Sequence, residues 1–325
     1  MRLIIAHLRA MATSLDRKLT FYVSNALASS TKAAYRRHLN SYVQFCTSLG
    51  LMAWPASELT IARYVTHLSA TSGLQSIRCH LAAIRLAHLM GDHSPAAMTS
   101  PLVHYTLLGL SKVQHRAPRR MTAMTPALLR SFIGHLDLNQ AADTLFWGAA
   151  LLMMYTLLRK SHILATSTPS HDTNLLRRAD VRFDKKGMTM TITRSKTRNA
   201  SMPPKVIRLQ AQKGRVLCPV GALRLALGVM ASAGEGSALL AWPDGRPYLY
   251  HQFLKLLRQL LTIVGADPDK YGAHSFRRGG ATLAADMGAS VEQLKALGDW
   301  RSDAYQAYIN PDTDLHKLST KMVRR

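Results

Sequence analysis

The sequence has few cysteines and no long apolar run. Three cysteines in 325 residues, at positions 46, 79 and 218, are too few and too widely spaced for a disulfide framework or a cysteine-rich zinc site. We therefore expect a reducing compartment. The longest apolar run, 148–158, is too short to cross a bilayer, and His7 and Arg9 interrupt the apolar stretch at the N-terminus, which makes it a poor signal peptide. We expect neither export nor membrane insertion.

Metal and nucleotide motifs are missing as well. The 14 histidines show no HExxH motif and no paired Cys/His spacing, and the chain has neither a GxxxxGK[ST] loop nor a dinucleotide glycine fingerprint. We therefore expect no metal, no cofactor and no small-molecule substrate.

Acidic residues are scarce, whereas basic residues are abundant. Lys and Arg number 42 against 18 Asp and Glu, which leaves a formal net charge of +24, and 47% hydrophobic residues indicate a folded chain. A ribosomal or chromatin protein, or a merely solvated basic surface, would also fit this charge, but nucleic-acid binding is favoured. The basic residues are spread over both halves, as at Arg36, Arg37, Arg78, Arg85, Arg119, Arg120, Arg177, Arg178, Arg277 and Arg278.

The first third of the chain reads as a helical bundle. Apolar residues recur at helical spacing in several segments, with serine and threonine caps before them and glycines after them. The expected helices cover residues 30–49, 59–68 and 74–90, and a fourth begins at Ser100 and Pro101. We expect a first domain over 1–115, followed by a basic, flexible linker over 116–124.

The remainder, 125–325, is expected to form a second domain that mixes helices with a small sheet. A helix should begin at Thr125 and Pro126, and the nearly all-apolar segment 144–158 should be a central helix. Alternating residues predict three antiparallel strands, around 181–183, 188–192 and 206–209, and helices resume from Val220. The fold class is therefore mainly α with a small antiparallel β-sheet.

The most informative segment is 271–309, YGAHSFRRGGATLAADMGASVEQLKALGDWRSDAYQAYI. His274 and Arg277 are three residues apart, so a helix that starts near Ser275 places both on one side of its positive N-terminal end, where a phosphate can bind. An HxxR pair alone is weak, because it is frequent by chance. Here it is followed by Gly288, a short helix capped by Ser290, the sequence Gly-Asp-Trp at 298–300, and a helix capped by Ser302 that carries Tyr305 and Tyr308.

This succession resembles the C-terminal half of the tyrosine recombinase (phage integrase) family. Three further motifs are similar to the family's in the same order: Leu-Leu-Arg-Lys-Ser at 157–161, Arg-Ser-Lys-Thr at 194–197, and Leu-Cys-Pro-Val at 217–220. The resemblance covers most of 125–310, and the N-terminal bundle loosely resembles the family's core-binding domain. The segments HSFRRGGAT and LGDWRSDAYQAYI are most similar to recombinases of eukaryotic DIRS-like retroelements and Cryptons.

The resemblance implies a set of catalytic residues and a DNA strand-cleavage reaction through a 3′-phosphotyrosine. Arg159 and Arg277 would grip the nonbridging oxygens of a phosphodiester with bidentate forks. His274 and Trp300 would supply N–H donors, with His274 a proton acceptor, and Lys196 would be the general acid. Tyr308 would be the nucleophile.

The chain departs from the family pattern at two positions. The family often has an acidic residue three positions after the first arginine, where this chain has His162, and many members have a histidine where it has Asp299. Trp300 is favoured over Asp299 as the donor, since an ionised carboxylate would repel phosphate. Tyr305 is the alternative nucleophile.

The implied partners are double-stranded DNA and further copies of the chain, because recombination joins two duplexes through a tetramer on DNA. The tail after Tyr308 is a candidate for docking on a neighbouring copy. If the chain comes from a eukaryotic mobile element, we expect it to act in the nucleus. If it does not, we expect it in the cytoplasm, at the nucleoid. A non-catalytic DNA-binding descendant of the family and a type IB topoisomerase are the alternative functions.

Overall fold

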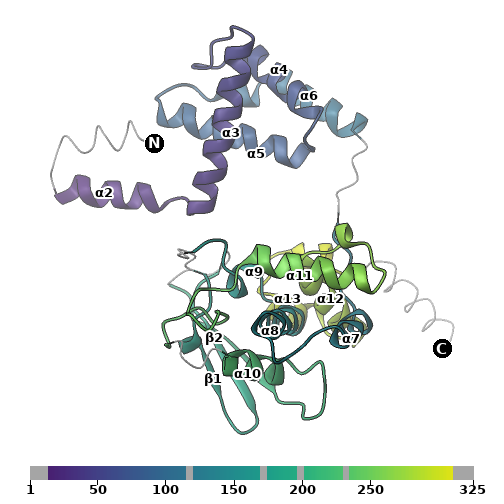
Figure 1. Ribbon diagram of the computed structural model, residues 1–325. Coiled ribbons are helices and arrows are strands. Elements are labelled where there is room, and N and C mark those ends of the chain that lie inside the picture. The colour runs from purple at the N-terminus through teal and green to yellow at the C-terminus, as the bar shows by residue number, and fades with distance from the viewer. Residues whose placement is uncertain (1–13, 115–119, 169–173, 196–200, 230–233, 310–325) are drawn as a thin grey trace. The chain divides into compact units, whose positions relative to one another are not determined.

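The computed structural model describes residues 14–114, 120–168, 174–195, 201–229 and 234–309. The chain divides into two compact units, Met1–Pro118 and Arg119–Arg325, and each has its own buried core (Figure 1). The predicted fold class, mainly helical with a small antiparallel sheet, is confirmed. Within the described ranges, no helix combines the length and the apolar character needed to cross a membrane.

The N-terminal unit is a helical bundle that contains the four predicted helices and a further helix over Ser14–Asn25 that was not predicted. The Ser57 hydroxyl accepts the Thr60 N–H at the start of one helix, and Ser100 caps another whose first residue is Pro101. Helix α3 packs against α5, and α4 packs against α6, around the buried rings of Tyr42 and Tyr64. The elements are α2 (Ser14–Asn25), α3 (Ser29–Ser48), α4 (Glu58–Ser69), α5 (Leu74–Met90), the 3-10 helix η1 (Ala96–Thr99) and α6 (Pro101–Val113).

In the C-terminal unit, a central helix is surrounded by further helices and one sheet. All three predicted strands are present, in the order β1-β2-β3, with Met190 of the middle strand opposite both Val181 and Ile207. The strands are β1 (Val181–Phe183), β2 (Gly187–Ile192) and β3 (Lys205–Gln210). The helices are α7 (Pro126–Ile133), α8 (Ala141–Thr156), α9 (Lys160–Ile163), η2 (Arg178–Asp180), α10 (Pro219–Val229), α11 (Tyr250–Ile263), η3 (Pro268–Lys270), α12 (Ala273–Asp286), α13 (Val291–Gly298) and η4 (Asp303–Ala307).

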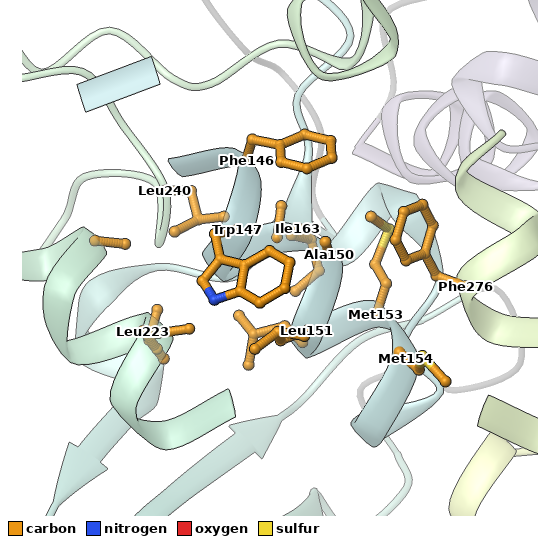
Figure 2. Close-up of a cluster of buried hydrophobic side chains, with 14 of the residues drawn as sticks. Phe146, Trp147, Ala150, Leu151, Met153, Met154, Ile163, Leu223, Leu240 and Phe276 are labelled. Atoms are coloured by element: carbon orange, nitrogen blue, oxygen red, sulfur yellow. The ribbon is translucent and has the colours of Figure 1, made fainter. Parts of the chain in front are cut away.

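Helix α8 is buried on nearly all sides, as its apolar sequence predicts. Figure 2 shows its side chains packed between Leu223 of α10 and Phe276 of α12. The predicted extension to Leu158 is wrong, because Leu157 adopts the left-handed conformation (φ +52°) and ends the helix after Thr156. The chain thus turns sharply just before Arg159.

Helix α12 approaches its neighbours so closely that two of its positions have room only for glycine. A Cβ atom on Gly280 would collide with the carbonyl oxygen of Met154 in α8, and one on Gly279 would collide with that of Met124. Both obstacles are backbone atoms, which cannot move aside as a side chain would. The two glycines therefore fix the distance between α12 and the core of the unit.

The second half of the predicted linker is packed onto the C-terminal unit. The Thr122 N–H donates to the carbonyl of Lys270 (2.7 Å), and the Met124 N–H donates to that of Ser275 (2.9 Å). The Met124 side chain is buried in the core. Residues 120–124 therefore belong to this unit by their contacts, whereas 115–119 lie outside the described residues.

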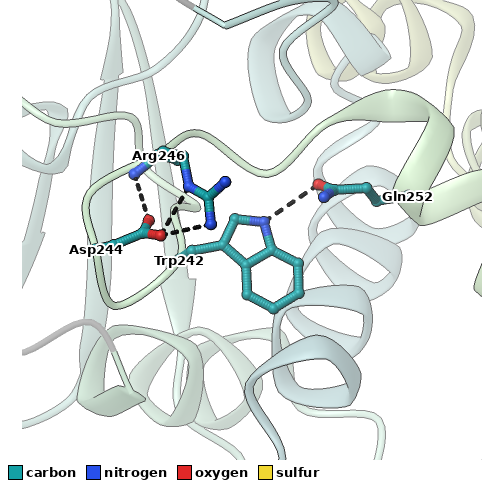
Figure 3. Close-up of polar contacts among 4 residues, drawn as sticks. All are labelled: Trp242, Asp244, Arg246 and Gln252. Carbon is teal, nitrogen blue, oxygen red and sulfur yellow. Dashed lines mark hydrogen bonds and ion pairs between the residues drawn. The ribbon is translucent and has the colours of Figure 1, made fainter.

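A tight turn before α11 fixes the position at which that helix begins. The indole N–H of Trp242 donates to Gln252 Oε1 (3.2 Å), which also accepts the N–H of Leu249, and the exposed Arg246 and Asp244 side chains pair within the turn (Figure 3). The first residue of α11 is Tyr250, whose ring lies against the candidate site described below.

Replacing Gly280 with alanine should destabilise the C-terminal unit. Overpacking a core usually costs about 1–3 kcal/mol, and we expect the upper end, about 3 kcal/mol, because the obstacle is helix backbone. Urea denaturation monitored by circular dichroism measures the change.

The matched control is Gly228→Ala, at a position in α10 where a new Cβ meets nothing within 4 Å. That variant should be neutral or slightly more stable, since alanine favours helix over glycine. Equal stability of the two variants would contradict the close approach of α12 and α8.

Candidate active site

Segments that are distant in the sequence meet at a small pocket in the C-terminal unit. The turn after α8, the end of β2, the start of β3, helix α12 and the end of α13 all contribute to its walls. Three cations, one carboxylate and one imidazole face this pocket. The lining residues are Leu157, Leu158, Arg159, His162, Ile192, Ser195, Lys205, Arg277, Gly298 and Asp299.

Arg277 is the most deeply buried of these cations, with 2% of its surface exposed. One terminal nitrogen of its guanidinium donates to the carbonyl of Leu157, and the other donates to the carbonyl of Gly298 (2.6 Å). Both acceptors are at the C-terminal ends of helices, where carbonyl groups lack partners within the helix and carry negative partial charge. Arg277 therefore ties the ends of α8 and α13 to α12.

Two aromatic rings lie against the Arg277 guanidinium. Its central carbon is 4.4 Å from the centroid of the Trp300 ring and 5.4 Å from that of Tyr308, and the two ring centroids are 5.1 Å apart. Burial and the neighbouring Arg159 charge lower the pKa of Arg277 to about 10, so the side chain is still cationic at neutral pH. This arrangement places the hydroxyl-bearing ring of Tyr308 beside a fixed positive charge.

The two candidate nucleophiles differ in their surroundings. Tyr305 is buried in a small apolar cluster with Leu157 and Leu294, whereas Tyr308 is half-buried at the end of η4. The helix predicted to carry both tyrosines is a short 3-10 helix that ends at Ala307, capped by Ser302 as predicted. The geometry favours Tyr308 over Tyr305, because its ring is the one next to Arg277.

Asp299 and Trp300 contribute to the site in different ways. Asp299 takes the left-handed conformation (φ +54°) at the end of α13, and its Oδ2 accepts a hydrogen bond from the Ser195 hydroxyl (3.0 Å). The Trp300 ring covers Gly298, where a Cβ would collide with it, and presents its face to Arg277. Trp300 is thus placed as a packing surface for Arg277, and the carboxylate of Asp299 lines the pocket.

The charges of Lys160, Arg277 and Arg159 act on His274 at the start of α12. This helix begins at Ala273, two residues earlier than predicted, and His274 is exposed there. Partial desolvation of its ring lowers the pKa of His274 most, and the charges of Lys160 and Arg277 lower it further. The Lys160 ammonium is 3.5 Å from the centroid of the Tyr250 ring, and burial lowers its pKa. His274 is therefore neutral at neutral pH, with a ring nitrogen able to accept a proton.

Lys205 is a site residue that the sequence analysis missed. Its ammonium donates to the carbonyl of Leu297 (2.6 Å) and lines the pocket. A signal was present, because Lys205 is two residues before the buried Ile207 and alternate residues of a strand share a face. Lys196, which the resemblance identified, lies outside the described residues.

His162 is the buried imidazole of the pocket, with 2% of its surface exposed. Burial, together with the charges of Arg159 and Arg277, lowers its pKa to about 4. The resemblance flagged this position only as a departure from an acidic residue, and the structure places it inside the cluster of cations. Among the described residues, no three His, Cys, Asp or Glu side chains are grouped to hold a metal ion.

Replacing His162 with glutamine should reduce the loss of stability in acid. The pKa of this histidine is about 4 in the folded chain and takes its ordinary value of about 6.5 in the unfolded chain. Between about pH 4 and about pH 6.5 the unfolded state therefore binds more protons than the folded state. The free energy of unfolding therefore falls as the pH falls through this window, by about 2 kcal/mol between pH 7 and about 4.5. His162→Gln should remove this share of the pH dependence, measured by urea denaturation at the two pH values.

The control for this experiment is His135→Gln, because His135 is exposed after α7. That variant should retain the pH dependence of the wild type. A His162→Gln variant with an unchanged pH dependence would show that this imidazole is not buried in the neutral form.

Comparison with known proteins gives structural matches only: no family model and no curated protein matches the sequence. The Tn1549 transposon integrase, solved with transposon right-end DNA, is similar with a TM-score of 0.63 at 12% identity, over 100% of this chain and 99% of that one. The XerH site-specific recombinase, solved with its difH substrate, has a TM-score of 0.59 at 11% identity, over 98% and 93%. A lambda integrase dimer bound to a core site has a TM-score of 0.55 at 14% identity, over 91% and 94%. The chain has the fold of the tyrosine recombinases.

Proposed function

We propose that the protein is a site-specific DNA recombinase or integrase that cleaves and rejoins DNA through a 3′-phosphotyrosine on Tyr308. The observation that carries the proposal is the contact of the Tyr308 ring with the buried Arg277, next to a pocket that Arg159 and Lys205 also line. The three solved structures named above are recombinases and integrases in complex with DNA or with their target sites, which supports DNA as the substrate.

The two arginines share the task of stabilising the phosphate. Attack on a phosphodiester builds negative charge on its nonbridging oxygens, and guanidinium groups stabilise such charge with paired N–H donors. Arg159 is the more exposed of the two, whereas both terminal nitrogens of Arg277 already donate to backbone carbonyls. We propose that Arg159 binds the phosphate through two paired N–H donors. Arg277 stabilises the phosphate through its positive charge and through the N–H groups that do not donate to the two carbonyls.

The remaining residues move protons. The Tyr308 oxygen attacks phosphorus, the bond from phosphorus to the 5′ oxygen breaks, and the tyrosine proton passes to neutral His274. Lys196 protonates the leaving 5′ oxygen. A 5′ hydroxyl from a second strand then attacks the phosphotyrosine, and the steps reverse. Because the phosphotyrosine retains the energy of the bond and the arginines supply the positive charge, we propose a reaction without metal, nucleotide or other cofactor.

The N-terminal unit is proposed to clamp DNA. Four exposed arginines lie on α3 and α5, which pack against each other. They are Arg36, Arg37, Arg78 and Arg85. We further propose a tetramer on DNA, an origin in a eukaryotic mobile element of the DIRS-like or Crypton type, and action in the nucleus.

Tyr308→Phe should abolish covalent capture of DNA. The test incubates the protein with a suicide substrate that carries a nick beside the cleavage site and resolves denaturant-resistant adducts on a gel. We expect an adduct with the wild type and none with Tyr308→Phe, because phenylalanine lacks the attacking oxygen.

Tyr305→Phe is the matched control, since this ring belongs to the apolar cluster and should need no hydroxyl for the reaction. An adduct that persists in Tyr308→Phe and vanishes in Tyr305→Phe would move the nucleophile to Tyr305. A wild type that binds DNA without any adduct would identify a non-catalytic binding protein. Strand exchange between two sites distinguishes a recombinase from a type IB topoisomerase, which relaxes supercoils alone.

The double variant Arg78→Ala, Arg85→Ala should weaken DNA binding most strongly at low salt. Each lost phosphate contact should lower the slope of log K against log salt by about 1, so we expect a decrease of about 2. Fluorescence anisotropy at several salt concentrations measures this slope. Arg246→Ala, which removes an arginine already paired with Asp244, should leave it unchanged. An unaltered slope in the double variant would contradict a clamp through α5.

A further inference from the structure

Three buried side-chain atoms have no hydrogen-bond partner within the described part of the chain, and all three belong to residues of the same pocket. They are both ring nitrogens of His162 and Nε of Arg277. A buried polar group without a partner costs about 1–3 kcal/mol, so native proteins contain few of them. Their concentration at one place calls for a physical explanation.

The three atoms are complementary in their hydrogen-bonding capacity. The Nε–H of Arg277 can only donate, whereas a neutral imidazole has one nitrogen that donates and one that accepts. His162 is neutral at neutral pH, because burial and its cationic neighbours lower its pKa to about 4. The imidazole can therefore accept from Arg277 and still has one N–H to donate.

Asp299 is the carboxylate that lines the pocket beside them. One of its oxygens accepts from Ser195, and a carboxylate can accept several hydrogen bonds. Its negative charge acts on both His162 and Arg277, opposing the decrease in the pKa of each. An acceptor for the remaining imidazole N–H is thus present in the same small space.

We propose that His162 is a positioning residue that bridges Arg277 and Asp299 in the assembled site. One ring nitrogen accepts the Nε–H of Arg277, and the other donates to the Asp299 carboxylate. This bridge fixes the plane of the Arg277 guanidinium, against which the Trp300 and Tyr308 rings lie. The inference rests on the proposed function, because the bridge acts through the nucleophile and the phosphate-stabilising arginine.

A reciprocal exchange tests the bridge directly. His162→Asp places a second carboxylate next to Asp299, and Asp299→His leaves two imidazoles among the cations without a carboxylate. The double variant restores one acid and one imidazole in exchanged places, with Asp at 162 able to accept from both Arg277 and the new histidine. Position 299 has φ +54°, a conformation that histidine tolerates nearly as well as aspartate.

We expect each single variant to slow adduct formation on the nicked substrate by about tenfold or more, which corresponds to 1.4 kcal/mol. The double variant should be faster than either single variant, and the melting temperatures of the DNA-free proteins should follow the same order. Effects that simply add, in both the rate and the melting temperature, would overturn the bridge, because residues in contact are not additive.

The two measurements separate the inference from the proposed function. If the wild type forms no adduct, the proposed function fails, and the melting temperatures alone decide whether His162 and Asp299 are coupled. If the wild type forms an adduct and the exchange recovers neither quantity, the bridge fails while the proposed function stands.

A second pair of variants excludes a role in packing alone. Glutamine at position 162 can accept and donate as the bridge requires, whereas leucine fills similar space without either capacity. We expect His162→Gln to form the adduct at least about tenfold faster than His162→Leu. A leucine variant that equals or exceeds the glutamine variant in this rate would overturn the proposal.

Discussion

The C-terminal unit is organised around a buried positive charge. Arg277 is held by the carbonyl groups at the ends of two helices, and its guanidinium supports two aromatic rings. A charge buried to this extent is tolerated only where hydrogen bonds and opposite charge compensate for lost hydration. The sharp turn at Leu157, the left-handed Asp299 and the close approach of α12 to α8 all contribute to this compensation.

The same residue connects the fold with the proposed chemistry. Its helix can lie close to α8 because Gly280 has no side chain, and this proximity brings the Leu157 carbonyl within reach of the guanidinium. Arg159 follows two residues after that carbonyl, so the turn after α8 supplies a backbone acceptor for the buried Arg277 and places the partly exposed Arg159 at the same pocket. The two arginines therefore differ in burial, although their side chains are chemically identical.

The sequence predicted the fold well where local signals agreed. The caps at Ser100 and Thr125 and the alternation over the strands led to correct elements, because each signal concerns neighbouring residues. Helix ends were less predictable. Helix α8 ends at Leu157 in the left-handed conformation, which a leucine in the sequence does not predict.

The site was predictable only in part. Arg159, His274, Arg277 and Tyr308 were identified through the family resemblance, and the structure brings them together, although their catalytic roles are still predictions. Lys205 could have been identified from strand alternation, whereas the contact of Lys160 with Tyr250 depends on tertiary packing that the sequence does not encode locally. The two departures from the family pattern, His162 and Asp299, looked unrelated in the sequence and line one pocket in the structure.

The position of Tyr308 at the end of a 3-10 helix makes its placement depend on contacts outside that helix. Helices of this type are short and have poor hydrogen-bond geometry, so η4 has little stability of its own. Its last turn is held from outside, through the hydrogen bond from Thr282 to the Tyr308 carbonyl and through the contact of the Tyr308 ring with Trp300. Segments of low local stability open far more often than the core that surrounds them. The fraction of molecules in which the Tyr308 ring lies beside Arg277 therefore depends on these few contacts, and a binding partner that strengthened or released them would change that fraction.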